Sequence, residues 1–266
     1  MRKTFFALSG TPVFLLAFAI AAAQDFQKSY SIPAGGEVAI NSVSGDVSVV
    51  GYNGNTVLVR AYKEGRDRNL VEIEDLSSGN RVELKTRYPQ DCRCDASVRF
   101  EVQVPATLSL KERLTTASGN IQVGMLSGDV LAKSASGEIS VRNVAGAINV
   151  KTASGNLEIL EVAGTVNAHT ASGNVDVSLT RVEGNENMEF TTASGNVTVK
   201  APANLDANVE MTTHSGSVRS DFPLSVTDRD AERNHFGPRS MRGRLGQGSR
   251  ELRITSASGN VKLQRL

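Results

Sequence analysis

A strict nine-residue spacing of glycines is the feature that most restricts how this chain can fold. Glycines stand at positions 119, 128, 137, 146, 155, 164 and 173. The surrounding phrases alternate: "TTASGNIQV", "KSASGEISV", "KTASGNLEI" and "HTASGNVDV" contain every second glycine, whereas positions 128, 146 and 164 have looser contexts. The repeating unit is therefore 18 residues long, with two turns and two short strands.

Columns of apolar residues emerge when the units are aligned on the glycine of each Ser-Gly pair. Alternation of apolar and polar residues is typical of strands with one buried face. The columns therefore predict that each unit forms one coil lying directly on the previous one, with neighbouring strands about 4.8 Å apart. Glycine permits the positive φ of a tight corner, and Ser and Asn provide side-chain hydrogen bonds there. Two places after the glycine stand Ile121, Ile139, Leu157, Val175, Val197, Val218 and Val261, and four places after it stand Val123, Val141, Ile159, Val177, Val199, Ser220 and Leu263.

The predicted fold class is all-β, a single-stranded β-solenoid with about 18 residues and two short strands per coil. A left-handed hexapeptide helix also has coils of this length, but its pattern would repeat every six residues rather than every nine. A two-sheeted coil is therefore favoured. The general rule for parallel crossovers makes it right-handed.

The repeats become less regular toward both ends of the chain. Residues 24–110 lack the strict period and are expected to form an irregular N-terminal β region that caps the solenoid. Residues 111–266 carry the solenoid repeats, with a long insertion at 221–250. The last coil in the sequence is expected to end the stack, where Lys262 and Arg265 would discourage edge pairing with another molecule.

Residues 1–23 have the pattern of a secretory signal peptide. Arg2 and Lys3 precede an apolar run over 13–20 and a small-residue end at 21–23. This uninterrupted run is shorter than the ~20 residues that cross a bilayer, so cleavage before Gln24 is favoured over a retained membrane anchor. The expected location is the periplasm or cell surface of a bacterium, with no stable membrane span after cleavage.

The charge of the mature chain is nearly balanced. Removal of the leader lowers Lys plus Arg from 29 to 27 against 28 Asp plus Glu, which gives a formal charge of −1. This balance provides no electrostatic reason to expect nucleic acid or anionic lipid as a partner.

Both cysteines lie in the segment "DCRCDASVRF". In an oxidising compartment a Cys92–Cys94 bond is possible. Alternate residues of a flat strand are ~6.6 Å apart, at the upper limit for a disulfide, so the backbone would have to bend. The two side chains share the parity of Val98 and Phe100, so they are interpreted as small buried hydrophobes or as a local staple rather than as a redox or metal site.

The order of these parts resembles a known family. An exported leader, "SIPAGGEVAINSVSGDVSVVGYNGNTVLVRAYK", the strand "VRFEVQVP", runs of "TASGN" and a closing "GQGSRELRITSASGNVKLQ" together resemble the bacterial putative-adhesin family of β-strand-repeat domains of unknown function. The resemblance covers residues 33–266. It implies a β-solenoid facing the cell envelope, and it supplies no established catalytic residues.

One outward column contains the strongest enzymatic hint. Glu158 and Asp176 would be neighbours on successive rungs, near the ~5 Å separation that retaining glycosidases use. A catalytic pair also needs a cleft and binding groups, whereas this face is expected to be flat with Arg142 and Lys200 as counter-charges, so a solvated pair is favoured. The column, three places after each Ser-Gly glycine, holds Gln122, Ser140, Glu158, Asp176, Thr198, Arg219 and Lys262.

A second outward column contains a short basic stripe, Lys133, Lys151 and His169. A charged face that keeps the sheet soluble is favoured here over an anion site. His169, His214 and His235 do not share a column, so no metal site is expected.

The long insertion is rich in arginine. It is interpreted as a solvated loop or a flap that covers a coil, in preference to a dedicated site for an acidic partner. Between 228 and 253 stand Arg229, Arg233, Arg239, Arg242, Arg244, Arg250 and Arg253.

These patterns favour a noncatalytic exported β-solenoid that acts as an envelope scaffold or as an adhesin-like binding surface. The expected partner is an envelope macromolecule, protein or polysaccharide, and no cofactor is expected. The alternative is a polysaccharide-active β-helix enzyme that uses Glu158 and Asp176. A third hypothesis is a signalling partner that binds through the arginine-rich insertion.

Overall fold

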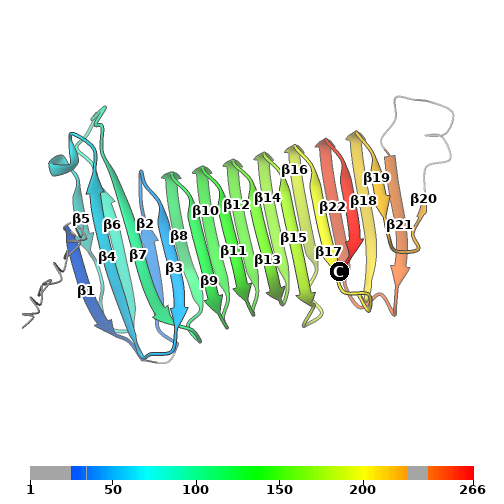
Figure 1. Cartoon of the computed structure of the whole chain (residues 1–266), viewed down its shortest axis with the longest axis horizontal. Coiled ribbons are helices and arrows are strands. Elements are labelled where there is room, and N and C mark those ends of the chain that lie inside the picture. The colour runs from blue at the N-terminus through cyan, green and yellow to red at the C-terminus, as the bar shows by residue number, and fades with distance from the viewer. Residues whose placement is uncertain (1–24, 34, 227–238) are drawn as a thin grey trace, which may run out of the picture.

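The computed structural model describes residues 25–33, 35–226 and 239–266, so the predicted leader lies outside the described residues. The chain forms two long sheets that face each other, with strands following one another as rungs along one axis (Figure 1). A short 3₁₀ helix, η1 (Arg68–Leu70), is the only helix in this part of the chain. The prediction of an all-β, single-stranded β-solenoid is confirmed.

The two sheets, here called sheet A and sheet B, take alternate strands of the repeats. The order in sheet A is β1 (Phe26–Ser31), β4 (Thr56–Glu64), β7 (Ser97–Pro105), β3 (Val47–Tyr52), β9 (Ile121–Leu126), β11 (Ile139–Val144), β13 (Leu157–Ala163), β15 (Val175–Arg181), β17 (Val197–Ala201), β23 (Val261–Arg265) and β19 (Val218–Ser220). The order in sheet B is β20 (Ser225–Val226), β21 (Arg239–Leu245), β18 (Ala207–Ser215), β22 (Glu251–Ser258), β16 (Met188–Ser194), β14 (Val166–Ser172), β12 (Ile148–Ser154), β10 (Val130–Ser136), β8 (Leu110–Ser118), β2 (Glu37–Asn41), β6 (Arg81–Arg87) and β5 (Glu72–Asp75).

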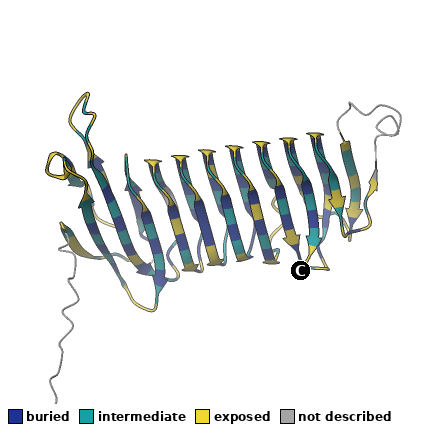
Figure 2. Cartoon of the chain, turned by 45° about the horizontal axis from the view of Figure 1, so that its top comes forward, coloured by how far each residue is buried: buried dark blue, intermediate teal, exposed yellow. Residues whose placement is uncertain are grey.

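The core consists of ladders of equivalent side chains. Ile139 pairs with Leu157, and Leu157 pairs with Val175, each 18 residues further along the chain. All three side chains are fully buried. Buried and exposed residues alternate along each rung (Figure 2), so one face of every strand points into a shared interior. One coil has no partner for its apolar face, whereas stacked coils bury it continuously.

The corner glycines stack with almost no space between coils. Gly155 has φ +155°, and a Cβ placed on it would lie 2.0 Å from the carbonyl oxygen of Gly137 in the preceding coil. The Thr170 hydroxyl donates to the Gly155 carbonyl at 3.1 Å, and the backbone N–H of Asn174 donates to Asn156 Oδ1 at 2.9 Å. The same approach, with a Cβ placed 1.9–2.1 Å from the next carbonyl oxygen, occurs at Gly119, Gly137, Gly155, Gly173, Gly195, Gly259 and Gly216.

Spatial order differs from chain order at the C-terminal end. Strand β23 lies between β17 and β19, and β22 lies between β16 and β18. The last coil in the sequence is therefore an interior coil, and the expectation that Lys262 and Arg265 guard a terminal edge is wrong. The chain first forms the coil of β18 and β19, then the antiparallel strands β20 and β21, and finally returns to fill the remaining position.

The N-terminal end has a comparable arrangement. Strands β2 and β3, from the predicted capping region, continue the parallel ladders directly onto β8 and β9. Strands β6 and β7 lie beyond them, and antiparallel strands β5, β4 and β1 cover the end. The division at residue 110 stays a prediction.

Replacement of a corner glycine should lower the unfolding free energy by more than the conformational cost of its positive φ, because the added Cβ also meets the neighbouring coil. Gly155→Ala combines the conformational cost of about 1–2 kcal/mol with a backbone collision that costs about 1–3 kcal/mol. Gly184 also has a positive φ, +73°, but a Cβ there meets nothing within 4 Å. Urea unfolding should show the larger loss of unfolding free energy for Gly155→Ala than for Gly184→Ala. Equal losses in the two variants would contradict the stacked corner.

Removal of residues 249–266 should disorder a neighbouring coil that it does not delete. Without β22 and β23, strands β18 and β19 lose their parallel partners, and β16 and β17 become edges. Amide hydrogen exchange should therefore accelerate over 207–220 while 121–160 stays protected. Removal of Leu266 alone is the control and should leave the protection of 207–220 unchanged, since this exposed residue lies beyond β23 and its backbone amide donates to Ala201. Full protection of 207–220 in the larger deletion would refute the interior position of the last coil.

Candidate functional site

The outer face of sheet A carries the column that contains Glu158 and Asp176. Register places these two carboxylates directly opposite each other on β13 and β15. Ser140 precedes Glu158 on β11, and Thr198 follows Asp176 on β17. Lys262 on β23 continues the row. The predicted rung neighbours are therefore brought together.

Glu158 is already engaged by its neighbours. Its Oε2 atom forms an ion pair with Arg142 and accepts a hydrogen bond from the Ser140 hydroxyl at 3.3 Å. Arg142 Nε also donates to the Ser140 hydroxyl at 3.3 Å. These contacts engage Glu158 with side chains of its own sheet.

Asp176 differs from Glu158 in its electrostatics. Burial raises the pKa of the Asp176 carboxyl, and the charge of Glu158 adds to that rise. A hydrogen bond with Thr198 and the charges of Lys200 and Lys262 oppose the rise without cancelling it. A carboxyl with a raised pKa beside an ionised one is the electrostatic pattern of an acid–base pair.

The surface around the two carboxylates does not enclose them. A hollow of about 400 Å³ lies on this face, between β3 and β13. Glu158 and Arg142 line one side of it, and Asp176 does not line it. Gly124, which has no side chain, is part of the lining of the hollow. A sugar bound there would meet one carboxylate of the proposed pair and not both.

The outer face of sheet B carries the basic stripe. Lys133 pairs with Lys151, and Lys151 pairs with His169, so the three side chains stack on successive rungs. Burial lowers the pKa of His169, Glu189 acts to raise it, and Lys151 acts to lower it. Thr115 precedes Lys133 in the same row.

Metal ligands are not gathered within the described chain. No group of three or more His, Cys, Asp or Glu side chains in residues 25–33, 35–226 and 239–266 is placed to hold a metal ion. His169 lies on the outer face of β14, and His214 lies near the end of β18. His235 lies outside the described residues.

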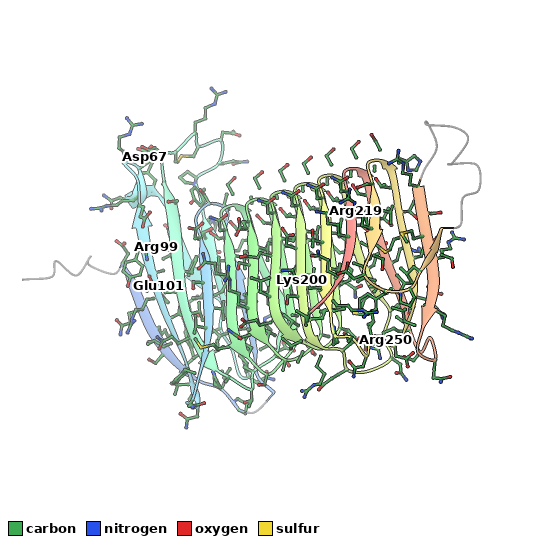
Figure 3. The ribbon with its side chains drawn as sticks, turned by 45° about the vertical axis from the view of Figure 1, so that its right-hand side comes forward. Asp67, Arg99, Glu101, Lys200, Arg219 and Arg250 are labelled. Atoms are coloured by element: carbon green, nitrogen blue, oxygen red, sulfur yellow. A yellow bond between two sulfur atoms is a disulfide. The ribbon has the colours of Figure 1, made fainter. Side chains whose placement is uncertain are left out.

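The described part of the arginine-rich insertion covers strand β18 of the outermost coil. Strand β21 pairs antiparallel with β18, and Arg242 and Arg253 both form ion pairs with Glu210. Arg250 is 8% exposed and donates to the backbone carbonyl of Asp206 at 3.1 Å (Figure 3). These arginines hold the end of the solenoid together. Arg229 and Arg233 lie outside the described residues.

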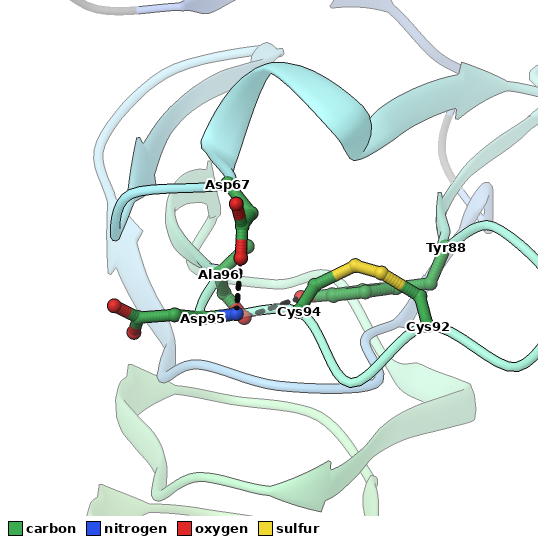
Figure 4. Close-up of a disulfide and its surroundings, with 6 residues drawn as sticks. All are labelled: Asp67, Tyr88, Cys92, Cys94, Asp95 and Ala96. Atoms are coloured by element: carbon green, nitrogen blue, oxygen red, sulfur yellow. Dashed lines mark hydrogen bonds between the residues drawn. A yellow bond between two sulfur atoms is a disulfide. The ribbon is translucent and has the colours of Figure 1, made fainter.

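The two cysteines form a disulfide with a Cα–Cα distance of 5.1 Å. They lie half-buried in a loop before β7 (Figure 4), so the expectation of small hydrophobes on a buried strand face is wrong. This Cα–Cα distance is shorter than the ~6.6 Å between alternate residues of a flat strand, so the backbone bends at Arg93, between the two cysteines. Across the same loop the Tyr88 hydroxyl donates to the Ala96 carbonyl at 3.2 Å. The local-staple interpretation is the one that holds.

The most strongly lowered carboxyl pKa lies away from both candidate faces. Asp75 on β5 accepts hydrogen bonds at Oδ2 from Lys28 at 2.6 Å and from the Tyr30 hydroxyl at 3.0 Å, both on β1. Burial by itself would raise the pKa of Asp75. Hydrogen bonds from Lys28, Ser77 and Tyr30 outweigh this effect and lower the pKa to about 2. The shift marks a structural contact between the end strands of the two sheets.

Sequence reasoning gave no sign of three features: the contact of Asp75 with β1, the burial of Arg250 and the hollow over Gly124. The partners of Asp75 and Arg250 are distant in sequence, and those of Arg250 are largely backbone carbonyls.

No helix among the described residues is long and apolar enough to cross a membrane.

The fold defines the molecule as a repeat protein of the β-solenoid class. The chain belongs to the Toastrack DUF4097 family, whose model matches residues 27–264. No curated protein matches it significantly.

Solved structures with a similar arrangement come from several bacteria. A putative adhesin from Bacteroides fragilis is 14% identical, with 91% of this chain and 96% of that chain covered and a TM-score of 0.48. A putative adhesin from Parabacteroides distasonis is 14% identical, with 89% and 96% covered and a TM-score of 0.41. A putative cell adhesion protein from Clostridium sporogenes is 11% identical, with 91% and 99% covered and a TM-score of 0.38. At these scores, nothing about the roles of those proteins is carried over to this chain.

Acid should weaken the contact between the end strands. A carboxyl whose pKa is lower in the folded state stabilises the protein above its unfolded pKa of about 3.9, and this stabilisation is lost as the pH falls toward 2. The unfolding free energy of the wild type should therefore fall more steeply between pH 5 and pH 2.5 than that of Asp75→Asn. Urea unfolding at a series of pH values measures both. Parallel curves for the two proteins would contradict the assignment of this shift to Asp75.

Proposed function

We propose that the chain is a noncatalytic exported β-solenoid that acts as an envelope scaffold or as an adhesin-like binding surface. The export signal pattern in residues 1–23 and the membership of the Toastrack DUF4097 family support this proposal. The expected location is the periplasm or the cell surface, and no cofactor takes part.

The observation that carries the proposal is the pair of long, regular outer faces. Eight corner glycines, counting Gly45, stack in one column, so equivalent outward positions recur over roughly 34 Å at about 4.8 Å per coil. A partner with its own repeat can therefore make the same weak contact at several rungs. Contacts linked in this way add to an affinity that no single rung provides.

The expected partner is an envelope protein or polysaccharide rather than nucleic acid. The near-zero charge of the mature chain, 27 basic against 28 acidic residues, disfavours the broad basic surface that duplex nucleic acid requires. The rows of hydroxyl, amide and isolated charged groups suit a polar chain molecule lying along the axis.

The second candidate is a polysaccharide-active enzyme that uses Glu158 and Asp176. The raised pKa of Asp176 favours it. The engagement of Glu158 by Arg142 and the position of the hollow, which excludes Asp176, weigh against it. A retaining glycosidase needs both carboxylates beside the same glycosidic bond.

Capture from a bacterial envelope extract tests the leading proposal. Mature chain, residues 24–266, is immobilised, and bound protein and sugar are identified after washing at physiological salt. Retention of a defined envelope polymer or protein by the native chain, and not by heat-unfolded chain, is the expected result. Absence of any specific retention would contradict the binding role.

Glu158→Gln with Asp176→Asn separates the two candidates. Both carboxylates are replaced by amides of similar shape, so envelope capture should stay within about twofold of the wild type if the role is noncatalytic. Release of reducing ends from envelope polysaccharide should be absent in both proteins. Turnover by the wild type that the double variant loses would establish the enzyme instead.

A further inference from the structure

The basic stripe on sheet B stacks positive side chains without opposite charges between them. Lys133 and Lys151 are direct register partners on β10 and β12. Like charges placed opposite each other on neighbouring strands destabilise a sheet. The fold therefore retains an arrangement that is unfavourable in the isolated molecule.

Counter-ions for the two lysines are missing within the described chain. Neither ammonium group forms an ion pair with any described carboxylate, whereas Arg142 and Arg242 on neighbouring surfaces are paired with Glu158 and Glu210. Glu189 faces the stripe only at its far end, where its charge acts on His169. The charge on this part of sheet B is available to an external anion.

A polar residue flanks the stripe on one side, and small residues flank it on the other. Asn149 stands two residues before Lys151, and Thr115 continues the row beside Lys133. Their Oδ1 and Oγ1 atoms are buried and find no hydrogen-bond partner among the described residues. The opposite flank is low, because Ala135, Ala153 and Ala171 stand two residues after the stripe on successive rungs and are all exposed. The stripe thus forms a shallow track along the solenoid axis.

A comparable group of cations on sheet A lacks this combination. Lys262 is the register partner of Arg219, and Lys200 lies nearby on β17 (Figure 3). The carboxylate of Asp176 shares that face, and the charges of Lys200 and Lys262 act on it. Lys200 and Lys262 therefore serve as a control pair of ammonium groups on the opposite sheet.

We propose that the stripe of Lys133, Lys151 and His169 binds a linear anionic polysaccharide lying along the solenoid axis, with sugar carboxylates on successive rungs. This inference rests on the proposed binding function and names the chemistry of its partner. A polyuronate carries one carboxylate per sugar, a repeat comparable with the rung spacing of about 4.8 Å. Duplex nucleic acid fits less well, because the positive charge forms one narrow row.

Titration of the mature chain with polygalacturonate tests the proposal, with fully methyl-esterified polygalacturonate as the uncharged counterpart. The wild type should bind the acid polymer and not the ester, with an affinity that falls as salt rises. Lys133→Gln with Lys151→Gln should weaken binding about tenfold, because two charge contacts of a multivalent site are lost. Lys200→Gln with Lys262→Gln should change it by less than about twofold. Lys133→Arg with Lys151→Arg should keep most of the affinity.

Several outcomes would overturn the inference. These are no binding of the acid polymer by the wild type, equal weakening by the two Lys→Gln pairs, equal binding of the ester, or tighter binding of duplex DNA through the same lysines. Unchanged unfolding midpoints verify that all variants are folded. If the Lys133→Gln, Lys151→Gln variant still captures envelope material as the wild type does, this inference fails while the proposed function stands. If the wild type captures nothing, the proposed function fails as well.

Discussion

The contact between glycine backbones at the corner is the constraint on which the rest of the structure depends. A Cβ at Gly137 would lie 1.9 Å from the carbonyl oxygen of Gly119, so the coils approach as closely as two backbones can. The hydroxyl of Thr152 then satisfies the carbonyl of Gly137 at 3.2 Å, and the same bond recurs from coil to coil. A column of bare backbone and a column of buried hydroxyls thus fix the spacing and register of every coil. The outer faces are regular because this corner is regular.

On the regular outer faces some charged side chains neutralise each other, whereas others have no opposite charge beside them. Outward positions that carry opposite charges on neighbouring rungs, such as Arg142 and Glu158, neutralise each other and stabilise the sheet weakly. Positions that repeat the same charge, such as Lys133 and Lys151, cannot neutralise each other and keep their charge for another molecule. In a β-solenoid the function is therefore read from which outward residues repeat without complement, rather than from a cleft. This also explains why a pair of carboxylates on such a face is weak support for catalysis.

Much of this fold could be predicted because the period is strict. The ladder of Ile139, Leu157 and Val175 follows from their 18-residue separation, and the burial of Thr152 and Thr170 follows from the alternation of inward and outward residues along a strand. The position of the last coil could not be predicted, since every coil bears the same corner phrase and any coil fits on any other. The left-handed residues Met125 and Glu161, with φ +57° each, also escape prediction, because neither residue type favours that conformation. For the candidate faces, the sequence predicted which outward side chains lie in one row along the solenoid axis. It did not predict which of them form ion pairs with residues on neighbouring rungs.

The exchange of chain order at both ends solves a problem that every solenoid has. A stack of parallel strands ends in open edges, and open edges recruit other chains. Here the final coil lies in the interior. Antiparallel strands β1, β4 and β5 cover the outermost parallel strands at the N-terminal end, and β20 and β21 cover sheet B at the C-terminal end, where sheet A ends in β19. At the C-terminal end residues 251–265 fill the position between two coils formed by earlier parts of the chain. Completing the stack therefore joins segments that are distant in sequence. The last coil in the sequence pairs with β16 and β17 on one side and with β18 and β19 on the other, so it is not an exposed end of the stack.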